Sequence, residues 1–185
     1  HLRYFYASKL GADAVDLDMN IEEFVAKVNS DIVGKVVNLA SRTAKFVDRL
    51  AQPYPDDGGL FARGAEAATT IATAYDAADF SRAMREVMAL ADRANEFVEQ
   101  SAPWQLKKDP AKIADLQRAC TIALNLFHQL AVYLAPVLPK LAQQAGDLLG
   151  APITTWTDAA KPLSGNSIKT FSHLTQRVEL AKVQA

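Results

Sequence analysis

The sequence predicts an all-α protein, a helical bundle of about five to seven helices, from three observations. Apolar residues recur with the 3.6-residue period of an amphipathic helix along most of the chain. No strand-like alternation of useful length appears in the 185 residues,. Prolines and glycines stand where the helical periodicity stops. With 50% hydrophobic and 22% charged residues, the composition is typical of a globular protein large enough to bury a core.

Two helices are predicted in the first 50 residues. An amphipathic pattern opens the chain, with one face made by Leu2, Phe5, Tyr6 and Leu10,. Asn20, followed three positions later by Glu23, forms a capping-box-like start for a long helix,. Its apolar positions follow one face over residues 21–50, and the prolines and glycines of 51–59 cannot continue it,.

The next helices are marked by their ends. An alanine-rich helix is predicted over residues 60–75, and Asp79 begins another that Pro103 ends,. Asp109 and Pro110 provide a cap and a first-position proline for the following helix,. That helix carries Cys120 on its apolar face, where a cysteine is typical core filling,.

The last third of the chain is predicted to be less regular. Pro136 breaks the preceding helix, and helical periodicity resumes over residues 137–149 with Gly150 as its C-cap,. Residues 151–169 are expected to be irregular, with Trp156 as their anchor. A short helix over residues 171–183 is expected to close the chain.

Charge and cysteine content restrict the possible partners. The 20 Lys and Arg residues nearly cancel the 21 Asp and Glu residues, for a formal net charge of -1. A diffuse grip on nucleic acid or membrane is therefore disfavoured, and such contact must be local. A single cysteine permits no internal disulfide and fits a reducing compartment,. With no apolar run long enough for a bilayer span, we expect a soluble, cytoplasmic protein. Because the chain starts inside an amphipathic pattern without an initiator Met, we expect it to be part of a longer one.

No active site or metal site is predicted. The histidines His1, His128 and His173 are scattered and accompany no cysteine pair, which disfavours zinc,. A glycine-rich phosphate loop and a Ser/His/Asp pattern are also missing. We therefore expect no catalytic residue, metal or cofactor in these 185 residues.

One polar stripe on the first long helix stands out. Its members, spaced by 3, 4, 3 and 4 residues, are Lys35, Asn38, Arg42, Lys45 and Arg49. They lie at the flank of the apolar face, with Asp31 as the only anion along it,. Most such stripes are simply solvated helix sides. This one combines four cations with an asparagine, which can both donate and accept hydrogen bonds.

Trp104 follows Pro103 at the end of a predicted helix, with Lys107 and Lys108 just beyond. The residues alone leave two interpretations open. The tryptophan can fill the core, or it can offer a flat surface for a base of single-stranded RNA, whose exposed edges Asn38 and Arg42 would then read.

"DIVGKVVNLASRTAKF" and "EQSAPWQLKKD" resemble the C-terminal helical domain of bacterial methionyl-tRNA synthetases. "LRYFYASKL" and "YLAPVLPKLAQQAGDLL" fit the same family, in the same order over the whole chain. The resemblance implies binding of the CAU anticodon of initiator and elongator methionine tRNAs. It implies that Trp104 stacks on the first anticodon base and that Asn38 and Arg42 hydrogen-bond to anticodon bases. Secondary roles would fall to Pro103, which would fix the tryptophan, to Lys35, and to Asp92 and Glu99, which would repel misplaced RNA.

The resemblance also implies a parent enzyme, a ligase of protein biosynthesis that joins methionine to tRNA with ATP. The "HIGH" and "KMSKS" type motifs and the zinc-bearing insertion of that family are not in this chain, so ATP and zinc would belong to a catalytic half outside it. Residues 1–20 would connect to that half, residues 21–150 would form the anticodon-binding bundle, and residues 151–185 would pack back toward the catalytic half. Apolar residues such as Phe5 and Leu174 would then be exposed in this chain. Neither membrane nor DNA is an expected partner.

Two alternatives remain open. The chain could be the related helical domain of a class I synthetase for leucine, isoleucine, valine or cysteine. It could also be a plain helical protein-interaction module, with Trp104 buried and the stripe merely solvated.

Overall fold

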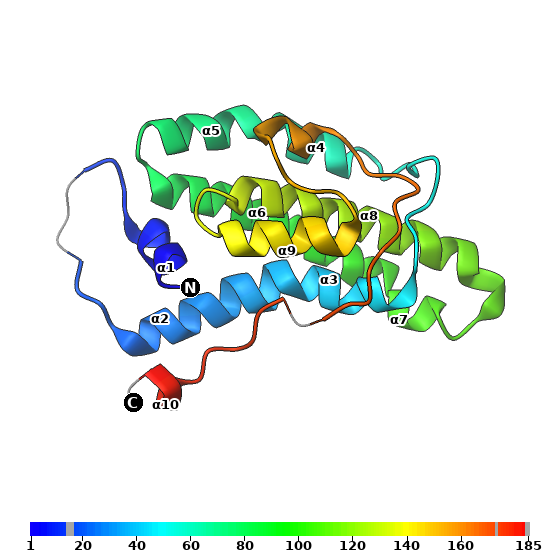
Figure 1. The fold of residues 1–185 in the computed structure, drawn as a ribbon, viewed down its shortest axis with the longest axis horizontal. Coiled ribbons are helices and arrows are strands. Elements are labelled where there is room, and N and C mark those ends of the chain that lie inside the picture. Colours follow the sequence, from blue (N-terminus) through cyan, green and yellow to red (C-terminus); the bar gives the residue numbers. More distant parts are fainter. Residues whose placement is uncertain (14–16, 173, 184–185) are drawn as a thin grey trace.

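The computed structural model describes residues 1–13, 17–172 and 174–183, and within them the chain forms an all-α bundle without strands (Figure 1). A single isolated bridge joins Arg49 and Ser167. This confirms the predicted fold class. The α-helices are α1 (Leu2–Lys9), α2 (Ile21–Val28), α3 (Asn38–Thr43), α4 (Leu60–Glu66), α5 (Ala68–Asp76), α6 (Phe80–Ser101), α7 (Pro103–Leu106), α8 (Ile113–Leu134), α9 (Pro139–Leu149) and α10 (Leu180–Val183).

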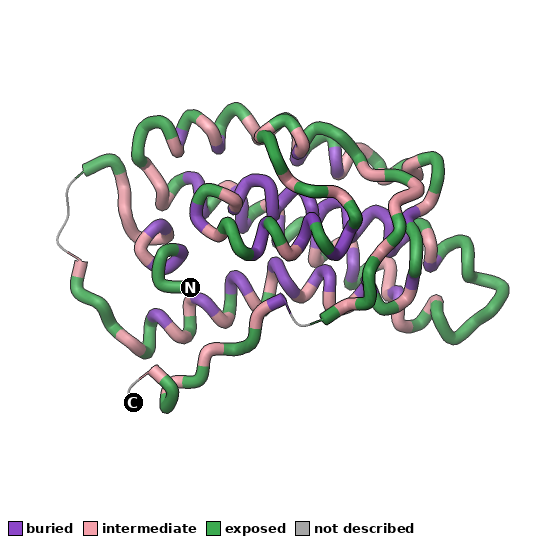
Figure 2. The backbone as a smooth tube through the Cα atoms, viewed as in Figure 1, coloured by how far each residue is buried: buried purple, intermediate pink, exposed green. Residues whose placement is uncertain are grey.

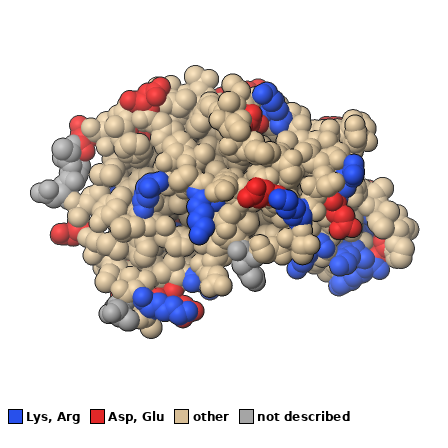
Figure 3. All heavy atoms as spheres, in the orientation of Figure 1, with Lys and Arg blue, Asp and Glu red and all other residues tan. Residues whose placement is uncertain are grey.

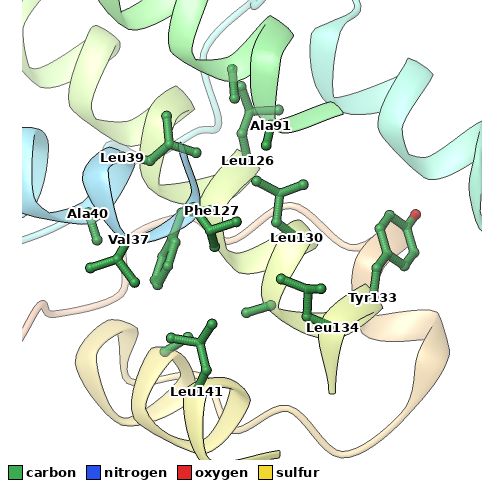
Figure 4. Packing of buried hydrophobic residues seen from close by; sticks show 14 of the residues in the cluster. Val37, Leu39, Ala40, Ala91, Leu126, Phe127, Leu130, Tyr133, Leu134 and Leu141 are labelled. Carbon is green, nitrogen blue, oxygen red and sulfur yellow. The ribbon is translucent and has the colours of Figure 1, made fainter. Parts of the chain in front are cut away.

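Helix α8 is the centre of the bundle. Every residue from Ala119 to Leu134 is buried, so this part of the helix is covered on all sides (Figure 2). An α-helix that is buried around its whole circumference is expected only at the middle of a fold. Figure 4 shows Phe127, Leu130 and Leu134 of α8 meeting Val37 and Leu141 from neighbouring segments. Cys120 is fully buried here, and burial raises the pKa of its thiol to about 12.

Two buried polar residues of α8 bind other parts of the chain. Asn125 donates from Nδ2 to the Leu163 carbonyl at 3.0 Å and accepts from the Leu163 amide at 2.6 Å. Gln129 donates to the carbonyls of Phe61, at 3.1 Å, and Ala159, at 2.7 Å. These bonds fasten the irregular segment after α9, and the start of α4, to the central helix.

The predicted long helix is present but is neither uniform nor as long as expected. Helical turns run without a break from Ile21 to Phe46, and Asn20 caps them by accepting from the Glu23 amide at 3.0 Å. The middle is a π-helix, η1 (Asn29–Val37), and the end is a 3-10 turn, η2 (Ala44–Phe46). The prediction of a helix to Leu50 is wrong. Residues 48–51 are instead extended and pair with residues 165–168, a partner segment that periodicity cannot reveal.

Most later helix ends confirm the predictions. Asp79 caps α6 through the Arg82 amide, at 3.2 Å, and Gly150 ends α9 in the left-handed region at φ 58°. Asp109 caps a 3-10 turn, η3 (Pro110–Lys112), that leads into α8. The irregular 151–169 segment contains one further 3-10 turn, η4 (Trp156–Ala160).

Both ends of the chain differ from expectation. The buried face of α1 is formed by Tyr4, Phe5 and Ala7, whereas Leu2 is 48% exposed. Phe5 and Leu174, expected to be exposed, are 2% and 8% exposed, because other elements of this same chain cover them. Phe5, for example, packs edge-on against Phe24 of α2, with ring centroids 5.6 Å apart.

The closing helix is also shorter than predicted. Only Leu180–Val183 is helical, and residues 174–179 are irregular; His173 lies outside the described residues. Asn29 explains the extended course, because it accepts from the Val178 amide at 2.8 Å and donates to the Val178 carbonyl at 2.9 Å. Backbone groups bound in this way cannot take part in a helix. Figure 1 shows this tail running beside α2.

His128 on α8 gives the first testable prediction. Its side chain is 2% exposed, and Nε2 has no partner. Burial lowers the pKa of the ring below 6.5, outweighing a hydrogen bond to the backbone of Ala151. In the range just below pH 6.5 the His128 ring binds a proton in the unfolded chain but not in the folded chain. The free energy of unfolding therefore falls as the pH falls through this range,.

We therefore expect the Tm to drop between about pH 7 and pH 5, and to drop less in His128→Gln. The pKa values of Glu99 and Asp158 are lowered by hydrogen bonds from Arg42 and from the amides of Thr154 and Thr155, respectively. Both carboxylates thus titrate below this window. Equal pH dependence in the two proteins would contradict the assignment.

Candidate RNA-binding face

The first three residues of the polar stripe, Lys35, Asn38 and Arg42, face α6 rather than open solvent. Lys35 Nζ lies 2.7 Å from Asp92 Oδ1, and Arg42 Nη1 lies 2.5 Å from Glu99 Oε1. Two carboxylates of a neighbouring helix thus lie against the stripe, besides Asp31, the anion expected along it. Asp31 accepts from the buried Tyr4 hydroxyl at 2.6 Å.

Both ion pairs are expected to contribute little to the stability of the fold. The carboxylate side chains of Asp92 and Glu99 are 58% and 60% exposed. Exposed pairs of this kind contribute little to stability, because water competes with them and salt screens them. The Arg42 hydrogen bond lowers the pKa of Glu99. Each cation is thus held in place at neutral pH, yet can exchange its carboxylate for another anion at small cost.

The position of Trp104 is set by the end of α6. Ala102 adopts the left-handed region at φ 42°, and Pro103 then opens α7 as its first residue. Pro103 is buried, so the corner is anchored, while Trp104 is half-buried and packs against the edge of the core. The guanidinium carbon of Arg42 lies 4.2 Å from the centroid of the indole ring, within cation–π distance,. Trp104 is therefore neither fully buried in the core nor free in solvent. One part of its ring packs against the core, and the outer part contacts Arg42 of the stripe.

Asn38 also meets α6. Its Nδ2 donates to Asn95 Oδ1 at 3.3 Å, and both side chains are half-buried. Asn38 and Arg42 are one turn apart on α3, and Arg42 lies over Trp104, so these three residues lie close together. Lys35, Asp92, Glu99 and Pro103 border the same place.

A second aromatic ring extends this face. Phe46 is half-buried, and its ring centroid lies 5.3 Å from Lys45 Nζ and 4.9 Å from Lys107 Nζ. In Figure 3 one group of blue side chains lies at the end of the molecule that carries α7, while others are spread over the rest of the visible face. Arg49 falls outside the stripe, because the helix has ended before it and its guanidinium binds the Gly165 carbonyl at 3.2 Å.

Sequence reasoning did not single out Asn95, Phe46 or Lys107 as members of this face. A signal for Asn95 was present, since Asp92, Asn95 and Glu99 follow one another at spacings of 3 and 4 and share one side of α6,. Phe46 and Lys107 lie far apart in the sequence, and nothing in their spacing indicates that they meet.

The described residues contain no group of three or more His, Cys, Asp or Glu side chains arranged to hold a metal ion. None of the helices in these ranges is both long enough and apolar enough to cross a membrane.

An all-α scaffold that sets an anchored tryptophan beside an arginine and an asparagine fits the class of helical modules that hold unpaired RNA bases,. Comparison with known protein families is more specific. Residues 51–177 match the anticodon binding domain of methionyl tRNA ligase, and residues 1–44 match the class I tRNA synthetases of the methionine type. The chain belongs to this methionyl-tRNA ligase family.

Curated relatives agree over the full chain. It is 54% identical to the methionine–tRNA ligase of Rhodopirellula baltica and 53% identical to methionine–tRNA ligase 1 of Sorangium cellulosum, with 100% of this chain covered. In both cases the chain spans 27% of the relative's length.

Solved structures support the fold. The free form of Mycobacterium tuberculosis methionyl-tRNA synthetase superposes with a TM-score of 0.87 at 22% identity, over 96% of this chain and 38% of that one. The same synthetase bound by methionyl-adenylate gives a TM-score of 0.83 at 23% identity, over 94% of this chain and 37% of that one.

Proposed function

We propose that this chain recognises the CAU anticodon of methionine tRNAs, initiator and elongator alike. It would serve as the anticodon-binding part of a ligase that joins methionine to tRNA with ATP in the cytoplasm. The observation that carries the proposal is the contact of Arg42 with Trp104, beside Asn38, in a chain of the methionyl-tRNA ligase family. In this arrangement Trp104 stacks on the first anticodon base, and Asn38 and Arg42 bind base edges.

The remaining residues of the face receive supporting roles. Pro103 fixes the backbone that carries the tryptophan. Lys35 and the lysine over the Phe46 ring supply positive charge for the RNA backbone,. Asp92 and Glu99 keep Lys35 and Arg42 extended toward α6 in the absence of RNA. Their repulsion of misplaced RNA remains a prediction.

The chemistry of the parent enzyme would lie outside this chain. The described residues contain no group arranged to hold a metal ion. From the family resemblance we propose that ATP and zinc are held by the catalytic half, the second proposed partner. The predicted boundaries at residues 20 and 150 also remain part of the proposal.

Replacing Arg42 tests the proposal directly. Arg42→Ala should weaken binding to an RNA hairpin with a CAU loop by about 1–3 kcal/mol, the usual value of a side chain that reads a base edge. Because its ion pair with Glu99 is exposed, the Tm should change little,. Fluorescence anisotropy with a labelled hairpin measures the affinity at fixed salt.

Arg93→Ala is the matched control. Arg93 is an exposed cation of α6 that makes no hydrogen bond or ion pair with the described residues. The Arg93→Ala variant loses the same positive charge as Arg42→Ala, at a position next to Asp92 but away from Trp104. If both variants lose affinity equally, binding is diffuse and the proposed role of Arg42 fails.

The alternatives predict other outcomes. The related domains of leucine, isoleucine, valine or cysteine synthetases would prefer a different anticodon, so a panel of hairpins distinguishes them. A plain protein-interaction module would bind none of them.

A further inference from the structure

Asn95 has a fixed amide orientation. From the middle of α6 its Nδ2 donates to two backbone carbonyls, Lys35 O at 3.0 Å and Ala91 O at 2.8 Å. The first carbonyl belongs to the π-helix η1 and the second to α6 itself. Turning the amide over would set its oxygen against two acceptors, which leaves both carbonyls and the oxygen without donors. The Asn95 oxygen must therefore point toward Asn38.

This orientation decides the orientation of Asn38. Since Asn95 Oδ1 can only accept, Asn38 must turn its Nδ2 toward it, and Asn38 Nδ2 does lie 3.3 Å from Asn95 Oδ1,. Asn38 Oδ1 lies at the opposite end of the amide, and no donor among the described residues binds it. The half-buried Asn38 thus offers the RNA an acceptor, while Arg42, one turn further on, offers only donors.

We propose that Asn95 is a positioning residue that turns the oxygen of Asn38 toward the RNA and so makes the site select a base with an exocyclic amine. This rests on the proposed function. Cytosine carries an amine donor at N4 next to ring acceptors, which matches an asparagine oxygen beside an arginine. Uracil has a carbonyl and an N–H in the same two places, so both contacts become repulsive. The selection against uracil at the base on Trp104 therefore depends on Asn95, which need not touch the RNA.

The ratio of affinities for CAU and UAU hairpins tests this, because both are measured on one preparation and any unfolded fraction cancels. Asn95→Ala removes the acceptor that holds Asn38, so its amide can turn over. We expect the preference for CAU to fall about tenfold, which corresponds to about 1.4 kcal/mol, largely through tighter binding of UAU. Asn95→Asp keeps an acceptor for Asn38 Nδ2, but its second oxygen faces the carbonyls of Lys35 and Ala91, so the Tm should fall,. Its charge should lower both affinities, while the ratio stays within about twofold of the unchanged protein.

Two outcomes would overturn the inference. One is an unchanged ratio in Asn95→Ala, and the other is an equal loss of preference in both variants, which would indicate a general structural role. If Asn95→Ala does not fold, Asn95→Leu fills the same space and carries the same expectation. The proposed function fails separately: the unchanged protein would then not bind the CAU hairpin at all, and the inference would fall with it.

Discussion

Trp104→Ala should lose about 1–3 kcal/mol of binding to a CAU hairpin, roughly a 5- to 150-fold loss of affinity. A base that stacks on the indole loses its whole contact surface when the ring is removed. Arg42 also loses the ring over which its guanidinium lies, 4.2 Å from the centroid. Since the ring is only half-buried, the variant should be destabilised by about 1 kcal/mol, well below the 3–5 kcal/mol of a core tryptophan. Binding by anisotropy and the Tm by calorimetry check both numbers.

Trp156→Ala is the opposite case within the same chain. Its ring packs 5.1 Å from that of Tyr133 and 6.0 Å from that of Tyr75, far along the chain from the stripe. This variant should lower the Tm more than Trp104→Ala does and leave hairpin affinity unchanged. If instead Trp104→Ala melts early and its folded fraction binds RNA normally, the tryptophan is structural, and recognition rests on Asn38 and Arg42.

The largest expected loss of stability comes from Asn125→Ala. Asn125 is fully buried and holds both the amide and the carbonyl of Leu163, with a third bond to the Thr121 carbonyl at 2.9 Å. Alanine cannot replace any of them. Two backbone groups of Leu163 would lose their partners, at about 1–3 kcal/mol each when water cannot reach them. We expect a loss of about 2–4 kcal/mol in the free energy of unfolding by urea, and a Tm lower by several degrees.

Asn166→Ala provides the control for Asn125→Ala. Asn166 lies in the same irregular segment and donates to the Gly150 carbonyl at 3.2 Å, but at an exposed site. Water can take over this bond, so the change should cost no more than about 0.5 kcal/mol. A similar loss in both variants would mean that the segment as a whole, and not the Asn125 contact, carries the stability.

Local signals in the sequence were sufficient for most of the fold. Asn20, Asp79 and Asp109 cap the turns that follow them, and Gly150 ends α9, because caps act within a few residues of themselves,. The errors arise where distant residues compete for the backbone. The helix predicted up to Leu50 stops at Phe46, since the amide of Leu50 donates to the Asn166 carbonyl instead. The helix predicted over 171–183 is mostly replaced because Asn29 binds Val178.

The candidate site divides in the same way. The spacing of Lys35, Asn38 and Arg42 indicates a shared helix side, and the family resemblance adds Trp104. The contacts that position these side chains come from α6, and their partners are 57 positions away in sequence. The spacing of Asn95 places it on one side of α6 with Asp92 and Glu99, but it does not show which atoms of the neighbouring helix Asn95 meets, and its proposed role depends on those atoms.

The long-range bonds of the last segment also concern synthesis of the chain on the ribosome. Residues 48–51, which follow the stripe directly, pair with residues 165–168. Asn29 binds Val178, which is 149 positions later in the sequence. A chain emerging at about 5–20 residues per second would expose the stripe helix for several seconds before these partners exist. The helices up to α9 can dock earlier through contacts closer in sequence. The contacts of the stripe with α6 form earlier, because their partners lie 57 positions away, so the two ends of the stripe helix are fixed after its middle.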